Sequence, residues 1–200
     1  MDEYQQNIEQ ETLKMARRIV NEFLSLPEVE VRLLADIIEK RTAKKGEVFI
    51  KEGQVCDSII YVTQGIARQF YYKNGVDITE HFTSEGQFLY CIESMYLQKP
   101  TSLMAEALEP LTYYKMNYLK LKELTRKSIG IAQWYIKLLE FDGLVSQEKA
   151  DVMRFESASE RYEHFLKYYP EAARRASSQH IASYLVMTRE SLSRVRAGKL

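Results

Sequence analysis

G-E-V-F-I-K-E-G (residues 46–53) and S-I-I-Y-V-T-Q-G (58–65) are two short apolar stretches that each end at a glycine. I-A-R-Q-F-Y-Y (66–72) follows, and then Asn74-Gly75 gives a two-residue hairpin signal, because both residues tolerate positive φ. Further segments of this kind continue to about residue 115. Short strands at this spacing predict an antiparallel β-roll, or jelly roll. The glycines expected at its corners are Gly46, Gly53, Gly65, Gly75 and Gly86.

Helical patterns flank this roll on both sides, which makes the predicted fold class α+β. Residues 4 to about 24 and residues 28 to 40 are expected to form helices before it, with Pro27 between them. Residues 119–127 are expected to form a short helix after it, and residues 129 to about 153 a long one.

The long helix carries an apolar seam that needs a partner. The seam consists of Ile131, Tyr135, Leu138, Leu139 and Val145. Either the surface of the roll covers it, or the same helix of a second subunit does. We favour the second subunit, because isologous pairing is a common use of such a helix. These five residues are therefore the predicted homodimer contacts.

Composition and charge restrict the class of protein. The chain has 200 residues, of which 46% are hydrophobic, so it can bury a core as one large or two small domains. No signal peptide or membrane-spanning run is visible, and a cytoplasmic protein without membrane contact is expected. The two cysteines are too few for a disulfide framework or a cysteine-based metal site, so neither a metal nor a cofactor is predicted.

The net charge of zero hides a basic C-terminal end. From Arg154 onward the chain has nine basic and five acidic residues, which gives +4 there and −4 in the first 153 residues. Residues 155–160 are short and polar and are expected to form a hinge, where Ser157 or Ser159 caps a further helix that Pro170 ends. We therefore divide the chain into residues 1–154, the roll with its long helix, and residues 155–200. The polarised charge points to an anionic partner for the second part.

Residues 177–199, S-S-Q-H-I-A-S-Y-L-V-M-T-R-E-S-L-S-R-V-R-A-G-K, have the pattern of a helix-turn-helix. Ser177 or Ser178 caps a first helix that ends near Leu185, and Thr188 caps a second one. The inward face is expected to consist of Ile181, Ala182 and Leu185 of the first helix and Leu192 and Val195 of the second. The second helix of such a motif enters the DNA major groove, where arginine bonds both acceptors of a guanine edge. The residues expected to contact double-stranded DNA are Ser178, Thr188, Arg189, Glu190, Ser193, Arg194 and Arg196.

The order roll, long helix and helix-turn-helix resembles the Crp/Fnr family of bacterial transcription regulators, over nearly the whole chain. The glycine-cornered roll and T-R-E-S-L-S-R-V (188–195) carry the resemblance, and Arg189, Glu190 and Arg194 match the base-reading positions of the family. The resemblance implies a cyclic-nucleotide-binding-domain-like roll. It also implies a homodimer that reads two-fold symmetric promoter sites and acts on RNA polymerase.

The nucleotide cassette of the family is altered here. In G-Q-F-L-Y-C-I-E-S-M-Y-L-Q-K-P-T-S (86–102), Cys91 stands where the family has a ribose-binding glutamate, and Thr101 stands where it has a phosphate-binding arginine. Without that cation an anionic cyclic phosphate loses its clamp. Tight cyclic-AMP binding is not expected, and the effector, if there is one, is unknown. The predicted pocket consists of Tyr90, Cys91, Glu93, Thr101 and Ser102.

Other functions are less well supported by the sequence. It contains no nucleophile elbow, Walker loop or H-E-x-x-H motif, so an enzyme is not expected. His81 is the only histidine in the roll and a poor candidate for a haem ligand. No sequence neighbour argues for a lowered pKa at Cys56 or Cys91, so a redox role for them is not favoured. The chain stops at Leu200, before the β-hairpin wing of the family. The main alternative is therefore a roll used as a protein-interaction module, without specific DNA binding.

Overall fold

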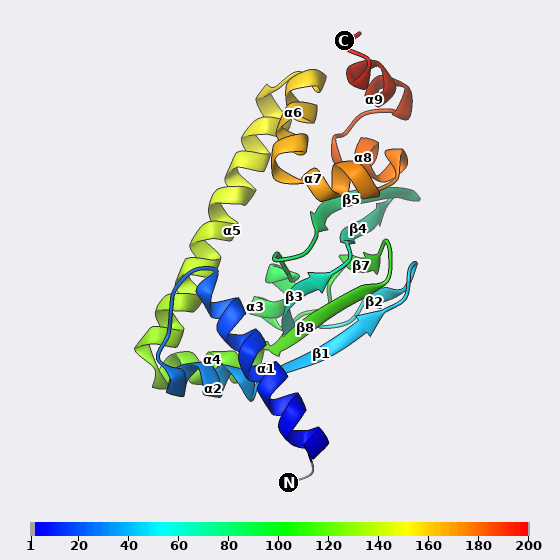
Figure 1. The fold of residues 1–200 in the computed structure, drawn as a ribbon. Coiled ribbons are helices and arrows are strands. Elements are labelled where there is room, and N and C mark those ends of the chain that lie inside the picture. Colours follow the sequence, from blue (N-terminus) through cyan, green and yellow to red (C-terminus); the bar gives the residue numbers. More distant parts are fainter. Residues whose placement is uncertain (1–2, 200) are drawn as a thin grey trace.

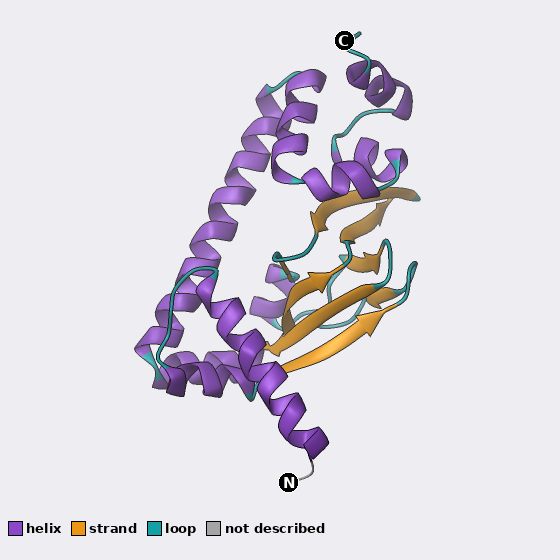
Figure 2. Ribbon diagram, in the orientation of Figure 1, coloured by secondary structure: helices purple, strands orange, loops and turns teal. Residues whose placement is uncertain are grey.

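The computed structural model describes residues 3–199 and contains an eight-stranded β-roll with helices around it (Figures 1 and 2). The strands pair antiparallel in two four-stranded sheets, with the orders β1-β8-β3-β6 and β2-β7-β4-β5. Their bounds are β1 Ile38–Ala43, β2 Val48–Ile50, β3 Ser58–Gln64, β4 Ala67–Lys73, β5 Val76–Thr83, β6 Phe88–Leu89, β7 Met104–Ala107 and β8 Leu111–Asn117. The predicted α+β class and the antiparallel roll are confirmed.

The helices lie at the two ends of the roll and along one side. Figure 1 shows α5 running from α2 and α4 at one end of the molecule to α6 at the other, with α7, α8 and α9 above β4 and β5. Their bounds are α1 Glu3–Asn21, α2 Glu28–Ala35, α3 Ile92–Leu97, α4 Tyr118–Lys127, α5 Ile129–Phe155, α6 Ala158–Tyr168, α7 Pro170–Arg175, α8 Ser178–Tyr184 and α9 Arg189–Arg196. In the part of the chain that the structure describes, no helix combines the length and apolar character needed to cross a bilayer.

The turns of the roll follow the glycine pattern of the sequence. Asn74 and Gly75 have φ values of 53° and 77° and join β4 to β5, where Lys73 pairs with Val76. Gly65 has φ +89°, and a Cβ atom at this position would lie 2.5 Å from the carbonyl oxygen of Pro110. Only glycine therefore fits this corner without a backbone shift.

One predicted helix is wrong in its second half. The apolar spacing predicted a helix over residues 28–40, but α2 ends at Ala35 and Ile38 begins β1. The register of β1 with β8 joins Ile38 to Met116 and Ala43 to Leu111, so strand pairing over a long sequence distance overrides the local pattern. Two short helices were not predicted. One is α3, and the other is α7, whose first residue is the Pro170 that was expected to end the preceding helix.

The molecule has two hydrophobic cores. The main core fills the roll and continues into α1, α2, α4 and the first half of α5, where Trp134 is fully buried. The second core joins Ile66 and Phe82 of the roll to Phe165, Tyr184 and other residues of α6–α9. At about 2 kcal/mol for each large apolar side chain buried, Ile66 and Phe82 make this core a real attachment of the C-terminal helices to the roll.

The predicted hinge lies where the chain turns back. α5 ends at Phe155, and the Ser157 hydroxyl caps α6 in a capping box with Glu160, so Ser157 and not Ser159 is the N-cap. The division of the chain at residues 154 and 155 falls at this break. Because the second core spans both parts, the C-terminal helices do not stand apart from the roll.

Candidate functional site

The helix-turn-helix forms where the sequence places it. The Ser177 hydroxyl accepts a hydrogen bond from the His180 N–H at 3.2 Å and caps α8, so Ser177 is the N-cap and not Ser178. The Thr188 hydroxyl accepts from the Ser191 N–H at 3.1 Å and caps α9. Between the helices, the Met187 N–H donates to the carbonyl of Ala182 at 3.0 Å and closes a tight turn.

The inner face of the motif is apolar and closely packed. Ile181 and Leu185 are fully buried, and Leu192 and Val195 of α9 are 1% and 8% exposed. Ala182 is 2% exposed, so its small side chain sits at the contact with the second core. The predicted inward face of both helices is confirmed.

The outer face of α9 carries the residues predicted to read bases. Arg189, Glu190, Ser193 and Arg194 are all exposed. Within residues 3–199, neither Arg189 nor Arg194 has a hydrogen bond or an ion pair with another side chain. Glu190 lies in the first turn of α9, where its hydrogen bonds to its own backbone N–H and to Thr188 lower its pKa. The guanidinium groups of Arg189 and Arg194 and the ionised carboxylate of Glu190 therefore face solvent together.

The side chains of the other predicted DNA contacts, Ser178, Thr188 and Arg196, form hydrogen bonds within the chain. The Arg196 Nη1 donates to the Ser178 hydroxyl at 3.0 Å, and its Nε donates to the Tyr162 hydroxyl at 3.2 Å. Arg196 and Ser178 thus bind each other across the motif and tie α9 to α8 and α6. Thr188 is occupied as the α9 cap.

The motif is attached to the roll through the edge of β5. The Ser183 hydroxyl of α8 accepts from the Thr79 N–H at 2.9 Å and donates to the Asp77 carbonyl at 3.0 Å. A side chain therefore satisfies two backbone groups of an edge strand. Nothing in the sequence around Ser183 signalled this role, because its partners lie 104 and 106 residues away.

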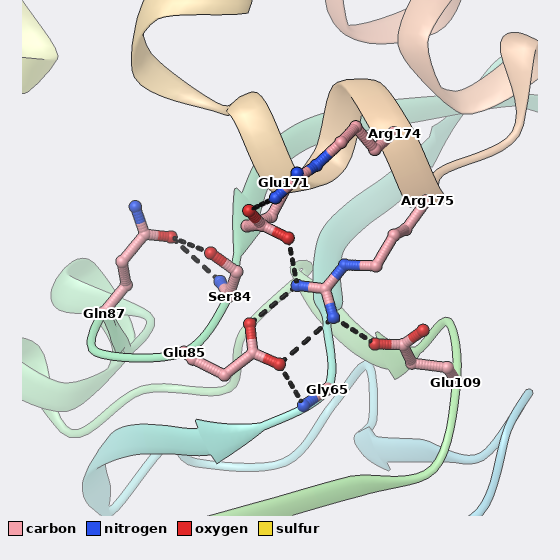
Figure 3. Close-up of polar contacts among 8 residues, drawn as sticks. All are labelled: Gly65, Ser84, Glu85, Gln87, Glu109, Glu171, Arg174 and Arg175. Atoms are coloured by element: carbon pink, nitrogen blue, oxygen red, sulfur yellow. Dashed lines mark hydrogen bonds and ion pairs between the residues drawn. The ribbon is translucent and has the colours of Figure 1, made fainter.

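A second attachment is a network of charged groups around Arg175 of α7 (Figure 3). The Arg175 guanidinium contacts Glu85 at 2.6 Å, Glu109 at 2.7 Å and Glu171 at 3.2 Å. Glu85 stands in the β5–β6 turn and also accepts from the Gly65 N–H at 2.7 Å. The hydrogen bond from Arg175 is the largest cause that lowers the pKa of Glu85.

A cavity of about 400 Å³ separates the roll from α5. Its lining includes Gln69, Glu80 and His81 of the roll, together with Asp142 and Lys149 of α5. The Lys149 ammonium contacts the Glu80 carboxylate at 2.5 Å, so the one cation among these residues is already paired. Burial raises the pKa of Asp142 and lowers that of His81 to about 4, with Lys149 as a lesser cause for His81.

Most of the predicted pocket residues lie elsewhere. Tyr90 lines the cavity. Cys91 and Thr101 are buried at 2% and 7% exposure and pack beside each other, whereas Glu93 and Ser102 are exposed. The sequence reasoning missed the residues of α5 that complete the cavity, because only the tertiary fold brings that helix to the roll.

Residues 40–128 match the family described as cyclic nucleotide-binding domain, which covers the roll from β1 to the end of α4. The chain is Crp/Fnr-like in fold. FixK2 from Bradyrhizobium japonicum superposes with a TM-score of 0.69 at 17% identity, over 81% of this chain and 84% of that one. A putative Crp/Fnr regulator from Eubacterium rectale gives 0.64 at 16%, over 86% and 83%. The c-di-GMP responsive regulator CLP from Xanthomonas campestris gives 0.59 at 17%, over 86% and 91%. None of the curated proteins matches by sequence.

In this Crp/Fnr-like fold, other residues of the same chain cover most of the predicted dimer seam. Ile131, Tyr135 and Leu138 belong to the main core, and Leu139 packs partly against it. Val145 lines the cavity. Of the two partners considered for the seam, the structure shows the roll domain for Ile131, Tyr135 and Leu138, which are buried within one subunit. The reason is that α5 packs against the roll domain with the more apolar of its faces.

A different face of α5 is apolar and exposed. Ile129, Ile136 and Leu144 are 78%, 51% and 71% exposed and follow one another at about two-turn spacing along the helix. Phe141 is 56% exposed beside them. That this helix joins two subunits stays a prediction, now carried by these side chains.

Proposed function

We propose that the protein is a transcription regulator that binds two-fold symmetric promoter DNA as a homodimer and acts on RNA polymerase. The observation that carries the proposal is the outer face of α9, where Arg189, Glu190 and Arg194 are exposed and neither arginine side chain has a hydrogen bond or ion pair within the described residues. Helix α9 also lies at the far end of the molecule from α1, clear of the roll (Figure 1). A major groove can therefore receive it without rearrangement of the roll.

The dimer in this proposal is formed by the exposed face of α5. Three large apolar side chains in a row on a charged helix are unusual for a free surface. A second copy related by a two-fold axis would cover them with the same residues and place two α9 helices on one side of the assembly. Ile136→Asp/Leu144→Asp is expected to give monomers in sedimentation, whereas the equally exposed Val29→Asp on α2 keeps the dimer.

The proposal includes no tight binding of cyclic AMP. Glu80 and Asp142 bring two carboxylates to the cavity, and Lys149 is paired with Glu80. An anionic phosphate would enter without a free cation to bind it. Millimolar cyclic AMP is expected to leave the melting temperature unchanged, and a clear upward shift would overturn this part of the proposal.

The test of DNA recognition is selection from a random duplex library. The wild type is expected to enrich a two-fold symmetric sequence with half-sites about one helical turn apart, and Arg189→Ala/Arg194→Ala is expected to enrich none. Arg126→Ala/Lys127→Ala on α4 removes the same charge at an exposed site remote from α9 and is expected to select the same sequence as the wild type. Sequence-blind binding by all three proteins that disappears with salt would favour the interaction-module alternative.

A further inference from the structure

Cys56 and Cys91 are 35 residues apart in the sequence and lie against each other in the roll. The Cys91 N–H points at the Cys56 sulfur at 3.5 Å, and the two thiols are in hydrogen-bonding contact. Both are free cysteines, 6% and 2% exposed. A disulfide requires two cysteines held this closely, and most pairs in a protein are not.

Hydrogen bonds that do not involve the thiol groups hold the segments of Cys56 and Cys91 next to each other. The Cys56 N–H donates to the Ser94 hydroxyl at 2.9 Å, which fixes the residue against α3. Thr101 exchanges two backbone hydrogen bonds with the Gln54 and Gly53 segment, at 2.8 and 2.9 Å. The loop before β3 and the segment around α3 are therefore fastened at both ends, so the sulfurs can join with little backbone movement.

The two thiols differ in their surroundings. The hydrogen bond from Cys91 is the largest cause that lowers the pKa of Cys56 to about 6, against the effect of burial. The same contact raises the pKa of Cys91, and burial adds to it. This corrects the expectation from the sequence, in which nothing near either cysteine lowered its pKa. Of the two thiols, Cys56 therefore ionises more readily and is the better nucleophile.

A route from solvent leads to Cys56. Cys56, which is 6% exposed, is one of the residues that line a cleft of about 440 Å³, together with Phe49, Asp57 and Lys115. Cys91 is not among the residues that line this cleft and is 2% exposed. A small oxidant therefore meets Cys56 first.

We propose that Cys56 and Cys91 are a redox-active dithiol, which a small peroxide oxidises to an intramolecular disulfide. The Cys56 thiolate attacks one peroxide oxygen, the O–O bond breaks, and Cys56 becomes a sulfenic acid as the released hydroxide takes up a proton to form water. The Cys91 sulfur then attacks the Cys56 sulfur. The S–O bond breaks, and the Cys91 proton leaves with the hydroxide as a second water. Two thiols lose two electrons, and one hydrogen peroxide gives two waters.

The position of the pair gives the disulfide a structural effect. Cys91 is the N-cap residue of α3, and its neighbours Tyr90 and Ile92 line the cavity between the roll and α5. Gln69, which also lines that cavity, donates to the Tyr90 carbonyl at 3.1 Å and to the Cys91 sulfur at 3.6 Å. Oxidation therefore changes a wall of this cavity without any ligand in it.

The first experiment counts thiols in the whole reduced chain, freed of reductant and titrated with hydrogen peroxide. The expected result is a loss of two thiols for each peroxide, with the mass falling by two hydrogens. A digest should contain one linked peptide with both cysteines, and dithiothreitol should restore both thiols. Three results would overturn the proposal: thiols that do not react, a mass that rises by oxygen atoms, or disulfide-linked dimers.

Single variants test the order of attack. In Cys91→Ser the Cys56 sulfenic acid has no thiol to resolve it, so dimedone is expected to label Cys56 with one thiol lost for each peroxide. Cys56→Ser leaves a protonated, enclosed Cys91 and is expected to react more slowly. Faster labelling of Cys91 than of Cys56 would overturn the assignment of Cys56 as the attacked thiol. The thiol count of the wild type needs no variant, so it stays decisive if a variant fails to fold.

Discussion

Arg175 and the pair Arg189 and Arg194 belong to the same C-terminal segment but have opposite surroundings. Arg175 is 26% exposed and contacts three carboxylates, two of which belong to the roll. Arg189 and Arg194 face solvent on α9, and no carboxylate of the described chain pairs with them. The comparison shows how one segment divides its positive charge. Part of it fastens the helix-turn-helix to the roll, and part of it is left for a partner outside the chain.

The contact between Arg175 and Glu85 shifts the pKa of both groups. The hydrogen bond between the two side chains is the largest cause that raises the pKa of Arg175 and the largest cause that lowers the pKa of Glu85. Both terminal nitrogens of the Arg175 guanidinium are held by carboxylates and are not free for phosphate or a guanine edge. An arginine that contacts a base needs the N–H groups of its guanidinium free of protein acceptors, as those of Arg189 and Arg194 are within the described residues. The two kinds of site should therefore respond differently to mutation.

The largest effect is expected for Arg189→Ala/Arg194→Ala on DNA affinity. Each bidentate contact to a base is worth about 1–3 kcal/mol, so the double variant should bind its selected site about 100-fold more weakly or worse. The free energy of unfolding should change by less than about 0.5 kcal/mol, because both side chains are exposed. Fluorescence anisotropy and urea denaturation measure the two quantities. A large loss of stability would show that these arginines are structural after all.

Gly65→Ala should produce the largest change in stability. The added Cβ would lie 2.5 Å from the Pro110 carbonyl oxygen at φ +89°, next to the N–H that Glu85 accepts from. We expect a loss of about 3 kcal/mol in the free energy of unfolding. Gly46→Ala is the matched control, because Gly46 has φ +79° with open space around it. It should lose only about 1 kcal/mol. Equal losses in the two variants would mean that the contact with Pro110 does not matter.

Arg175→Gln should cost less than Gly65→Ala, because a quarter of the Arg175 side chain is exposed and solvent screens the network. Its loss leaves Glu85 and Glu109 without their cation, and we expect a decrease of about 1–2 kcal/mol in the free energy of unfolding. Arg174→Gln is the control. It removes the same charge from the next residue, which is 70% exposed, and should cost less than about 0.5 kcal/mol. Urea denaturation of both variants at low and high salt would show whether the difference is electrostatic.

The smallest effect is expected from the titration of His81. Its pKa is about 4 in the folded protein, below the ordinary 6.5, so the unfolded chain binds the proton more tightly. Stability should be unaffected above pH 6.5 and should fall as the pH drops from there toward 4. The ring borders a cavity, so solvent limits the loss to about 1 kcal/mol. The difference in pH dependence between wild type and His81→Gln isolates it. No difference over this range would mean that His81 titrates alike in both states.

Local signals in the sequence were sufficient for a large part of the fold. The Asn74-Gly75 turn, the Thr188 cap and the buried face of α8 and α9 each depend on a few neighbouring residues. Such features are decided by backbone preferences and by side chains that satisfy the first N–H groups of a helix. They were predicted correctly for that reason.

The parts that were missed depend on contacts between distant residues. The apolar spacing up to Ile38 fits a helix, and only the pairing of β1 with β8 makes this segment a strand. The apolar seam of α5 was correct as a seam, but its spacing could not say whether a roll or a second subunit covers it. The contact of Cys56 with Cys91 and the attachment of Ser183 to β5 have no local signature at all.

The two sides of the second core are synthesised at different times during translation. Ile66 and Phe82 are translated early, whereas the aromatic and aliphatic residues that cover them come from α6 to α9, up to Leu192. The residues of the main core end at Leu138, with Leu139 packed partly against them, so the roll can fold on the ribosome while the last helices are still being made. Until they emerge, the nascent roll presents a bare apolar patch around Ile66 and Phe82. A ribosome that stalls before α6 to α8 have emerged would therefore leave this patch uncovered and open to aggregation.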